Sequence, residues 1–244
     1  MPLLKSRGPR LYFEEYGEGY PLLLLAPGGM YSSIEHWRQG PTGGAPFDPI
    51  KEFSTDFRVI AMDQRNAGKS VAPIQPTDGW ADYLRDQLHL LDHLGITECH
   101  VIGACIGASY GLSLCQALGG RITAAVLQNP IGLWRNRRVF NDMFDEWADE
   151  VKSRTNQTTL SSVREHMFGG TFVFSVSRQY VSTCQTPLLV LGGDDDFHPR
   201  KIATDLADLA PQAELVVDWN SADHLSQTID RVRRFLKRHT PTSR

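Results

Sequence analysis

The stretch VIGACIGASYG, Val101 to Gly111, joins strand-forming residues to a helix-like run through a cysteine flanked by glycines. A sharp turn between a strand and a helix exposes its central side chain, and here that residue is Cys105. Gly103 and Gly107 suit the strained backbone and close packing of such a turn. The amides at the helix start favour a thiolate and a developing oxyanion. The stretch predicts a nucleophile at Cys105; the alternative is a buried, unreactive thiol.

Strand-like and helix-like segments alternate along most of the 244 residues. This alternation predicts an α/β fold with a mostly parallel central sheet and helices on both faces. The polar–apolar alternation of segment 10–17 predicts an edge strand, whereas the apolar run in segment 20–27 suits the sheet centre. Further strands are expected in segments 57–63, 99–104, 124–130, 186–194 and 213–219, and helices in segments 77–96, 108–120, 200–210 and 226–239.

The alternation breaks between about residues 131 and 186, where two helices are expected in segments 141–154 and 159–168. Because this stretch is short and has no strand-like segment, we expect a helical lid within a single domain spanning residues 1–244. Apolar side chains recur there at helical spacing, and they either pack the lid on the body or line an apolar pocket. The candidate substrate-binding residues are Met30, Trp134, Phe140, Met143, Phe144 and Trp147.

The composition excludes several classes of protein. The formal net charge is -3 and no long basic run is present, so neither a nucleic acid nor an anionic membrane is an expected partner. The early apolar run 22–26 is much shorter than the roughly 18 residues of a membrane span. The four cysteines lack CxxC spacing, and no cluster has zinc-ligand spacing. We therefore expect free thiols, no metal, no cofactor and a cytoplasmic location.

Four further motifs, in addition to the turn at Cys105, resemble those of the α/β-hydrolase superfamily. They are LLLLAPGG (22–29), DQRNAGKS (63–70), PLLVLGGDDDFHP (187–199) and SADHLSQ (221–227). Two departures stand out, since Pro27 replaces the family's loop histidine and Asn66 replaces a glycine. The resemblance covers nearly the whole chain and implies the α/β-hydrolase fold, with nucleophile, acid and histidine in that order.

The resemblance also implies the partners of Cys105 in a catalytic triad. His224 lies where the family has its general base, with His36 and His198 as alternatives in other loops. Among the consecutive acids Asp194, Asp195 and Asp196, only one can face the imidazole. Counted from Gly193, the family spacing selects Asp196, and Asp195 is the alternative.

In the family, two backbone amides stabilise the oxyanion, and the resemblance assigns them to Gly29 and Ile106. A cysteine nucleophile suits activated carbonyls, so the expected function is hydrolysis of an ester, thioester or lactone through an acyl-enzyme. The expected partner is thus a small-molecule acyl substrate. An acyltransferase, a lyase and a non-catalytic ligand-binding protein on the same fold are the alternatives. The oligomeric state is left open.

Overall fold

The computed structural model describes residues 3–5, 8–40 and 45–242, and its centre is an eight-stranded sheet. The strand order is β1-β2-β4-β3-β5-β6-β7-β8, with β1 and β2 antiparallel to their neighbours and the other strands parallel. The strands are β1 (Leu3–Lys5), β2 (Arg10–Tyr16), β3 (Pro21–Leu25), β4 (Arg58–Met62), β5 (Cys99–Ala104), β6 (Ile122–Gln128), β7 (Leu188–Leu191) and β8 (Ala213–Val216). The predicted mostly parallel α/β fold is confirmed.

Helices cover both faces of the sheet, as expected for strands that are apolar on both sides. One face packs against α3 (Trp80–His93), α4 (Ile106–Leu118) and α8 (Arg200–Leu209). The other face packs against α1 (Glu35–Arg38), α2 (Pro49–Phe53) and α9 (Ala222–Arg238). All six residues of β5 are buried, which places the strand that leads to Cys105 at the centre of this core.

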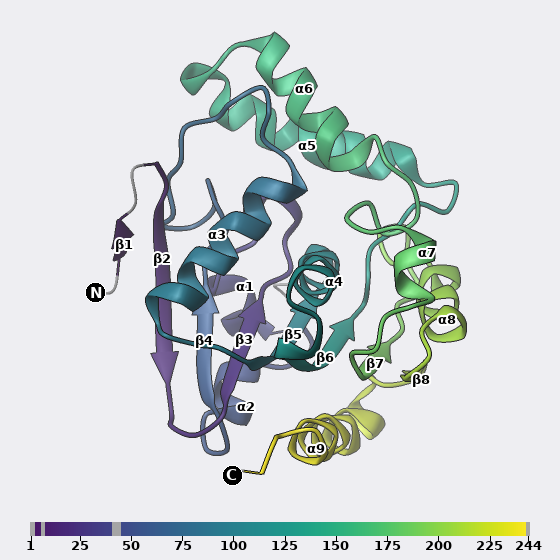
Figure 1. Cartoon of the computed structure of the whole chain (residues 1–244). Helices are drawn as coiled ribbons and strands as arrows, with labels where there is room; N and C mark the ends of the chain where they lie inside the picture. Colours follow the sequence, from purple (N-terminus) through teal and green to yellow (C-terminus); the bar gives the residue numbers. More distant parts are fainter. Residues whose placement is uncertain (1–2, 6–7, 41–44, 243–244) are drawn as a thin grey trace.

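The connection between β6 and β7 carries helices and no strand in its described residues, as predicted. It contains α5 (Arg137–Val151), α6 (Gln157–Phe168) and α7 (Arg178–Val181). Figure 1 shows α5 and α6 above the end of the sheet at which the parallel strands terminate. Because binding residues gather at the carboxyl ends of parallel strands, these two helices lie over the region where a site is expected.

Segment 10–17 was predicted to be the edge strand, and this prediction was wrong. Strand β2 pairs with β4 on one side and with the three-residue strand β1 on the other. Tyr12 and Phe13 of β2 are buried, and Leu11 is fully buried. The additional short strand escaped prediction because three residues carry too little periodicity to distinguish a strand from a loop.

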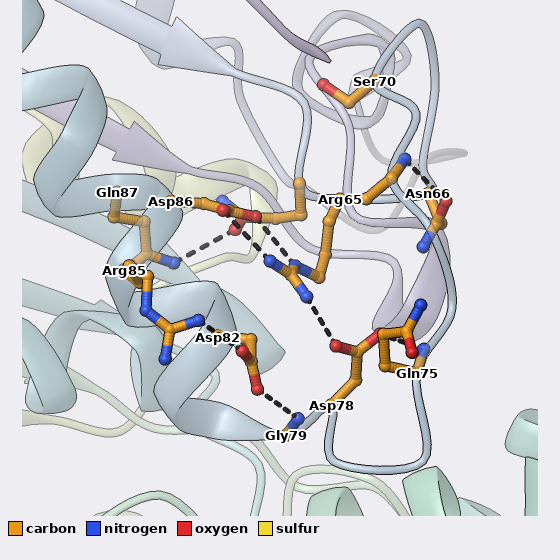
Figure 2. A network of polar contacts seen from close by, with 12 residues as sticks. Arg65, Asn66, Ser70, Gln75, Asp78, Gly79, Asp82, Arg85, Asp86 and Gln87 are labelled. Carbon is orange, nitrogen blue, oxygen red and sulfur yellow. Dashed lines mark hydrogen bonds and ion pairs between the residues drawn. The ribbon is translucent and has the colours of Figure 1, made fainter. Parts of the chain in front are cut away.

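Part of the motif that resembles DQRGxGxS forms a buried polar network (Figure 2). The Arg65 guanidinium donates to Asp86 at 2.8 Å and to Asp78 at 2.9 Å, and all three side chains are less than one-tenth exposed. Asp78 also accepts a hydrogen bond from the Gln75 amide at 3.0 Å. Because an unpaired buried charge is costly, these contacts hold the β4–α3 connection in one arrangement.

The network also reaches helix α4 through aromatic rings. The Arg65 guanidinium lies 5.7 Å from the centre of the Tyr83 ring, and Tyr83 stacks on Tyr110 of α4 at 5.1 Å. Trp80 packs on the same Tyr110 ring and donates its indole N–H to the Met167 carbonyl at the end of α6. The start of α3 is therefore anchored to both α4 and the helices above the sheet.

None of the helices in the described part of the chain is long and apolar enough to cross a membrane.

Candidate active site

Cys105 lies at the sharp turn between β5 and α4, with backbone angles φ 55° and ψ -119° that non-glycine residues rarely adopt. The two flanking glycines make this turn possible. A Cβ on Gly103 would lie 2.1 Å from the Gly107 carbonyl oxygen, and a Cβ on Gly107 would lie 1.9 Å from that of Leu25. Both distances are far below van der Waals contact, so only glycine fits at these positions. The packing holds the thiol of Cys105 at the carboxyl end of the sheet.

The imidazole beside Cys105 belongs to His198, in the loop that follows β7. His198 Nδ1 lies 2.8 Å from Asp195 Oδ2 in the same loop. The amides of Phe197 and His198 donate to the other carboxylate oxygen of Asp195, at 2.8 and 3.0 Å. Three hydrogen bonds thus bind the carboxylate to its own loop and orient the ring of His198. The remaining nitrogen, Nε2, is buried and makes no hydrogen bond of standard geometry among the described residues, although His198 lies close enough to Cys105 for the two charges to interact.

Charges in this cluster stabilise one another. Burial would raise the pKa of the Cys105 thiol, but the positive charge of His198, its hydrogen bond and two backbone amides together lower that pKa. Burial would lower the pKa of His198, yet the negative charge of Cys105 and the hydrogen bond to Asp195 raise it to about 10. The hydrogen bond from His198 lowers the pKa of Asp195 to about 2. The arrangement favours ionisation of the Cys105 thiol and protonation of the His198 ring.

The backbone amides that help to lower the pKa of the Cys105 thiol are those of Gly28 and Ile106. Gly29 and Ile106, whose amides were predicted to stabilise the oxyanion, both line the cavity beside Cys105. Gly28 has φ 110°, and a Cβ there would lie within 3.0 Å of the His36 ring. His36 is itself held by Ser33, whose Oγ lies 3.1 Å from Nδ1. His36 therefore packs against the loop of Gly28.

The predicted contact between His224 and Cys105 is absent. His224 is exposed, and its Nδ1 lies 3.0 Å from the Oγ of Ser221. Helix α9 turns the side chains of Leu225, Thr228 and Val232 toward the body, so position 224 lies outside this inward stripe. His224 occupies the position that the sequence motif predicts, but the first turn of α9 directs its side chain to solvent.

The predicted acid, Asp196, also lies outside the cluster. Its carbonyl accepts a hydrogen bond from the Asn136 side chain at 2.7 Å, and its exposed carboxylate lines a separate surface hollow beside Trp134. In this loop, the turn that brings the ring of His198 inward places Asp195, three residues earlier, beside its Nδ1. The structure thus brings Asp195 and His198 to Cys105, and not Asp196 and His224.

A mostly apolar cavity of about 210 Å³ opens beside Cys105 and His198. Two of the predicted pocket residues, Phe140 and Met143, line it. Met30, Phe144 and Trp147 are instead buried in the core, and Trp134 is 46% exposed away from the cavity. The residues that complete the wall are Pro27, Gly28, Gly29, Ile106, Ile131, Phe168 and Phe197.

Sequence patterns missed part of this wall. Phe197 could have been found from its place beside His198, but Ile131 and Phe168 carry no local signal that separates a pocket from a core position. No group of three or more metal-ligating side chains occurs in the described residues.

The fold and this cluster define an α/β protein with a candidate thiol nucleophile at a strand–turn–helix elbow. A family model for the alpha/beta hydrolase fold matches residues 21–183. The chain therefore belongs to the α/β-hydrolase fold family, and it is a hydrolase of this type.

Relatives match along most of the chain. A putative carbamate hydrolase RutD of Azorhizobium caulinodans is 24% identical in an alignment that covers 91% of both proteins. A 2-hydroxymuconate semialdehyde hydrolase of Pseudomonas putida is 24% identical in an alignment that covers 95% of this chain and 92% of that protein. Among solved structures, a variant of the meta-cleavage product hydrolase CumD from Pseudomonas fluorescens IP01 superposes with a TM-score of 0.68 at 17% identity. That match covers 96% of this chain and 98% of the other, and it shows a shared fold.

Proposed function

We propose that this protein hydrolyses an activated ester, thioester or lactone through a covalent acyl intermediate on Cys105. The observation that carries the proposal is the chain of contacts from Cys105 through His198 to Asp195 at the wall of the cavity. Such a chain supplies a nucleophile, a proton carrier and a group that orients the carrier. The base and the acid both come from the loop after β7.

In the proposed first step, the Cys105 thiolate attacks the substrate carbonyl carbon. As the sulfur loses its charge, the amides of Gly28 and Ile106 become available to the carbonyl oxygen, on which negative charge develops. The imidazolium of His198 then gives its proton to the leaving oxygen or sulfur. Because this ring is already protonated at neutral pH, no separate proton source is needed for acylation.

In the second step, the now neutral His198 removes a proton from a water molecule that attacks the thioester carbonyl. Cys105 leaves as a thiolate, and the imidazolium forms again. Asp195 holds Nδ1 throughout and stabilises the charged ring. This step returns both groups to their starting charges.

The cavity wall supports a substrate with a neutral, apolar or aromatic acyl group of medium size. Phe140, Phe168 and Phe197 supply most of its aromatic surface, with Met143 beside the loop of Gly29. We propose that α5 and α6 act as a lid over this cavity. No Arg or Lys lines the cavity in the described residues, so a muconate carboxylate, as in the relative's name, has no positive partner there other than His198.

The proposal is tested by intact-mass analysis after exposure to two matched thioesters, one with a benzoyl group and one with a carboxybenzoyl group. A benzoyl adduct on Cys105 that decays in water supports it, with the charged analogue reacting much more slowly. Cys105→Ala should form no adduct. Cys105→Ser should react at least a hundredfold more slowly, because the hydroxyl is far less acidic than the thiol and the shorter C–O bond draws the nucleophilic atom back from the position of the sulfur.

Two results would count against hydrolysis. An adduct that decays only when an added alcohol or amine is present would identify an acyltransferase. The absence of any adduct, together with ordinary alkylation of Cys105 by iodoacetamide at pH 7, would indicate a binding protein.

A further inference from the structure

The turn between α5 and α6 is joined to the body of the protein by hydrogen bonds that the proposed mechanism does not use. The Arg154 guanidinium, in the turn that follows α5, donates to Asn66 Oδ1 at 2.6 Å and to the Ala72 carbonyl at 2.9 Å. Four residues earlier, at the end of α5, the Glu150 carboxylate accepts a hydrogen bond from the Tyr31 hydroxyl at 2.9 Å. The end of α5 is therefore bonded to the loops that follow β3 and β4.

The body side of this contact is held in place by its own loop. Asn66 replaces a glycine of the family motif and has φ 60°, a left-handed conformation that asparagine tolerates better than most residues. Its Oδ1 also accepts a hydrogen bond from the Ala72 amide at 3.0 Å. Asn66 directly follows Arg65, whose buried network holds the same connection (Figure 2). The oxygen that a glycine would lack is thus a fixed acceptor for Arg154.

Helix α5 links this contact to the cavity. Phe140 and Met143 lie in the first half of the helix and line the cavity beside Cys105. A Cβ on Gly29 would lie 2.7 Å from Met143 Sδ, so the helix packs closely on the loop that follows β3. Because a helix moves as one rigid element, a change at its last turn also changes how its first half lies against this loop.

We propose that Arg154 and Asn66 are positioning residues for the candidate reaction, whose hydrogen bond holds α5 against the loop of Gly29 and so closes the apolar wall of the cavity. The inference rests on the proposed function, because it concerns the wall that would receive the acyl group. Arg154 is exposed and Asn66 is half-buried, so their hydrogen bond is weak enough to be lost without unfolding the protein. Its loss should loosen Phe140 and Met143 at the cavity and lower the preference for an aromatic group.

The experiment compares the alkylation of Cys105 by N-benzyl iodoacetamide and by unsubstituted iodoacetamide in the folded, full-length protein. The measured quantity is the ratio of the two rate constants, obtained by peptide mass spectrometry and divided by the same ratio for N-acetylcysteine. This ratio cancels the intrinsic reactivity of the thiol and reports on the cavity wall. Arg154→Ala should lower the ratio by roughly threefold or more, as expected for the loss of one exposed hydrogen bond. Lys152→Ala removes another exposed cation of the same turn and should leave the ratio unchanged.

Two substitutions at Asn66 test whether its acceptor oxygen is responsible. Asn66→Gly removes this oxygen while suiting the backbone at φ 60°, so it should lower the ratio as Arg154→Ala does. Asn66→Asp keeps an acceptor oxygen for Arg154 and should keep the wild-type ratio. Combining Asn66→Gly with Arg154→Ala should lower the ratio little further, because both changes remove the same contact.

Three results would overturn the inference. They are a wild-type ratio equal to that of N-acetylcysteine, a ratio unchanged in Arg154→Ala, and an Asn66→Asp protein that behaves like Asn66→Gly. Alkylation does not require turnover, so the ratio can be measured even if no acyl adduct forms. The absence of an adduct would thus contradict the proposed function, whereas an unchanged ratio would contradict only the role of Arg154 and Asn66.

Discussion

Asp195 and His198 lie three residues apart in one loop, with Oδ2 of the acid 2.8 Å from Nδ1 of the ring. The exposed fraction of the His198 side chain is 16%, whereas that of Asp195 is 59%. One short turn therefore supplies both partners of Cys105. The shape of the loop after β7 controls the protonation and the position of the imidazole together.

Alanine substitutions at His198 and His224 distinguish the two candidate bases. His198→Ala should reduce turnover of an activated thioester by at least a thousandfold, because attack and proton transfer both lose their partner. His224→Ala should leave turnover within about twofold, since this side chain is exposed and bonds only to Ser221. Steady-state kinetics of both variants measure the difference. Equal losses in the two would show that His224 also reaches the site.

Asparagine substitutions at Asp195 and Asp196 distinguish the two candidate acids in the same way. Asp195→Asn should lower kcat on the order of a hundredfold, because it weakens the hydrogen bond that orients His198. The loss of kcat should be smaller than for a fully buried acid, because water reaches this carboxylate. Asp196→Asn keeps the carbonyl that accepts from Asn136 and should have little effect. The same pair can be compared by the alkylation rate of Cys105 at pH 7. A larger loss in Asp196→Asn would reverse the assignment.

The pH profile of the wild-type enzyme should show an alkaline limit. His198 has a pKa raised from 6.5 to about 10, so its proton is held through neutrality and lost as the pH rises through about 10. The pKa of Cys105 is lowered from 9.0, so its thiolate persists below that pH. Turnover should therefore fall on the alkaline side near pH 10. In His198→Ala, the positive charge and the hydrogen bond of the ring are lost and only the two amides still oppose burial, so alkylation of Cys105 should need a higher pH than in the wild type. Identical alkylation profiles in the two proteins would refute the thiolate–imidazolium pair.

Two glycines of the elbow helix test the packing that forms the turn. Gly107→Ala should destabilise the protein on the order of 3 kcal/mol, because the new Cβ would lie 1.9 Å from the Leu25 carbonyl oxygen. Gly111→Ala adds the same methyl on the same helix, where the new Cβ would lie 3.3 Å from a methyl carbon of Val101 and not from backbone. Its effect should stay within about 1 kcal/mol, since the gain in helix propensity offsets the tighter contact. Urea unfolding gives both values, and similar losses would contradict this account of the elbow.

Asn136 connects the start of α5 to the loop that carries Asp195 and His198. Its side chain donates to the carbonyls of Gly132 and Asp196 and accepts from the amide of Trp134. Asn136→Ala should lower kcat by roughly tenfold with a smaller change in KM, because the loop of Asp195 loses an anchor. The rate of Cys105 alkylation at pH 7 should fall as well, whereas a loss of stability in another part of the protein would leave that rate unchanged. Arg138→Ala, a change at an exposed residue on the first turn of α5, is the control.

Much of the fold followed from local patterns. The run Val101 to Gly111 specifies a strand, a turn and a helix because its residue sizes and propensities change within a few positions, and the structure has this order. The long apolar strands and amphipathic helices were predicted for the same reason. The three-residue strand β1 and the four-residue helix α7 were missed, since neither is long enough for a period to show.

The candidate site, like the fold, was predicted only in part from the sequence. Sequence determined that a cysteine occupies the elbow, that acids and a histidine follow β7, and that another histidine begins the last helix. Only the tertiary structure decided which of these meet, because a loop turn and a helix rotation direct the side chains. The turn after β7 brings the ring of His198 to Cys105 and the carboxylate of Asp195 to that ring, whereas the rotation of α9 leaves His224 in solvent. The direction of a side chain depends on packing between distant segments, which motif spacing does not encode.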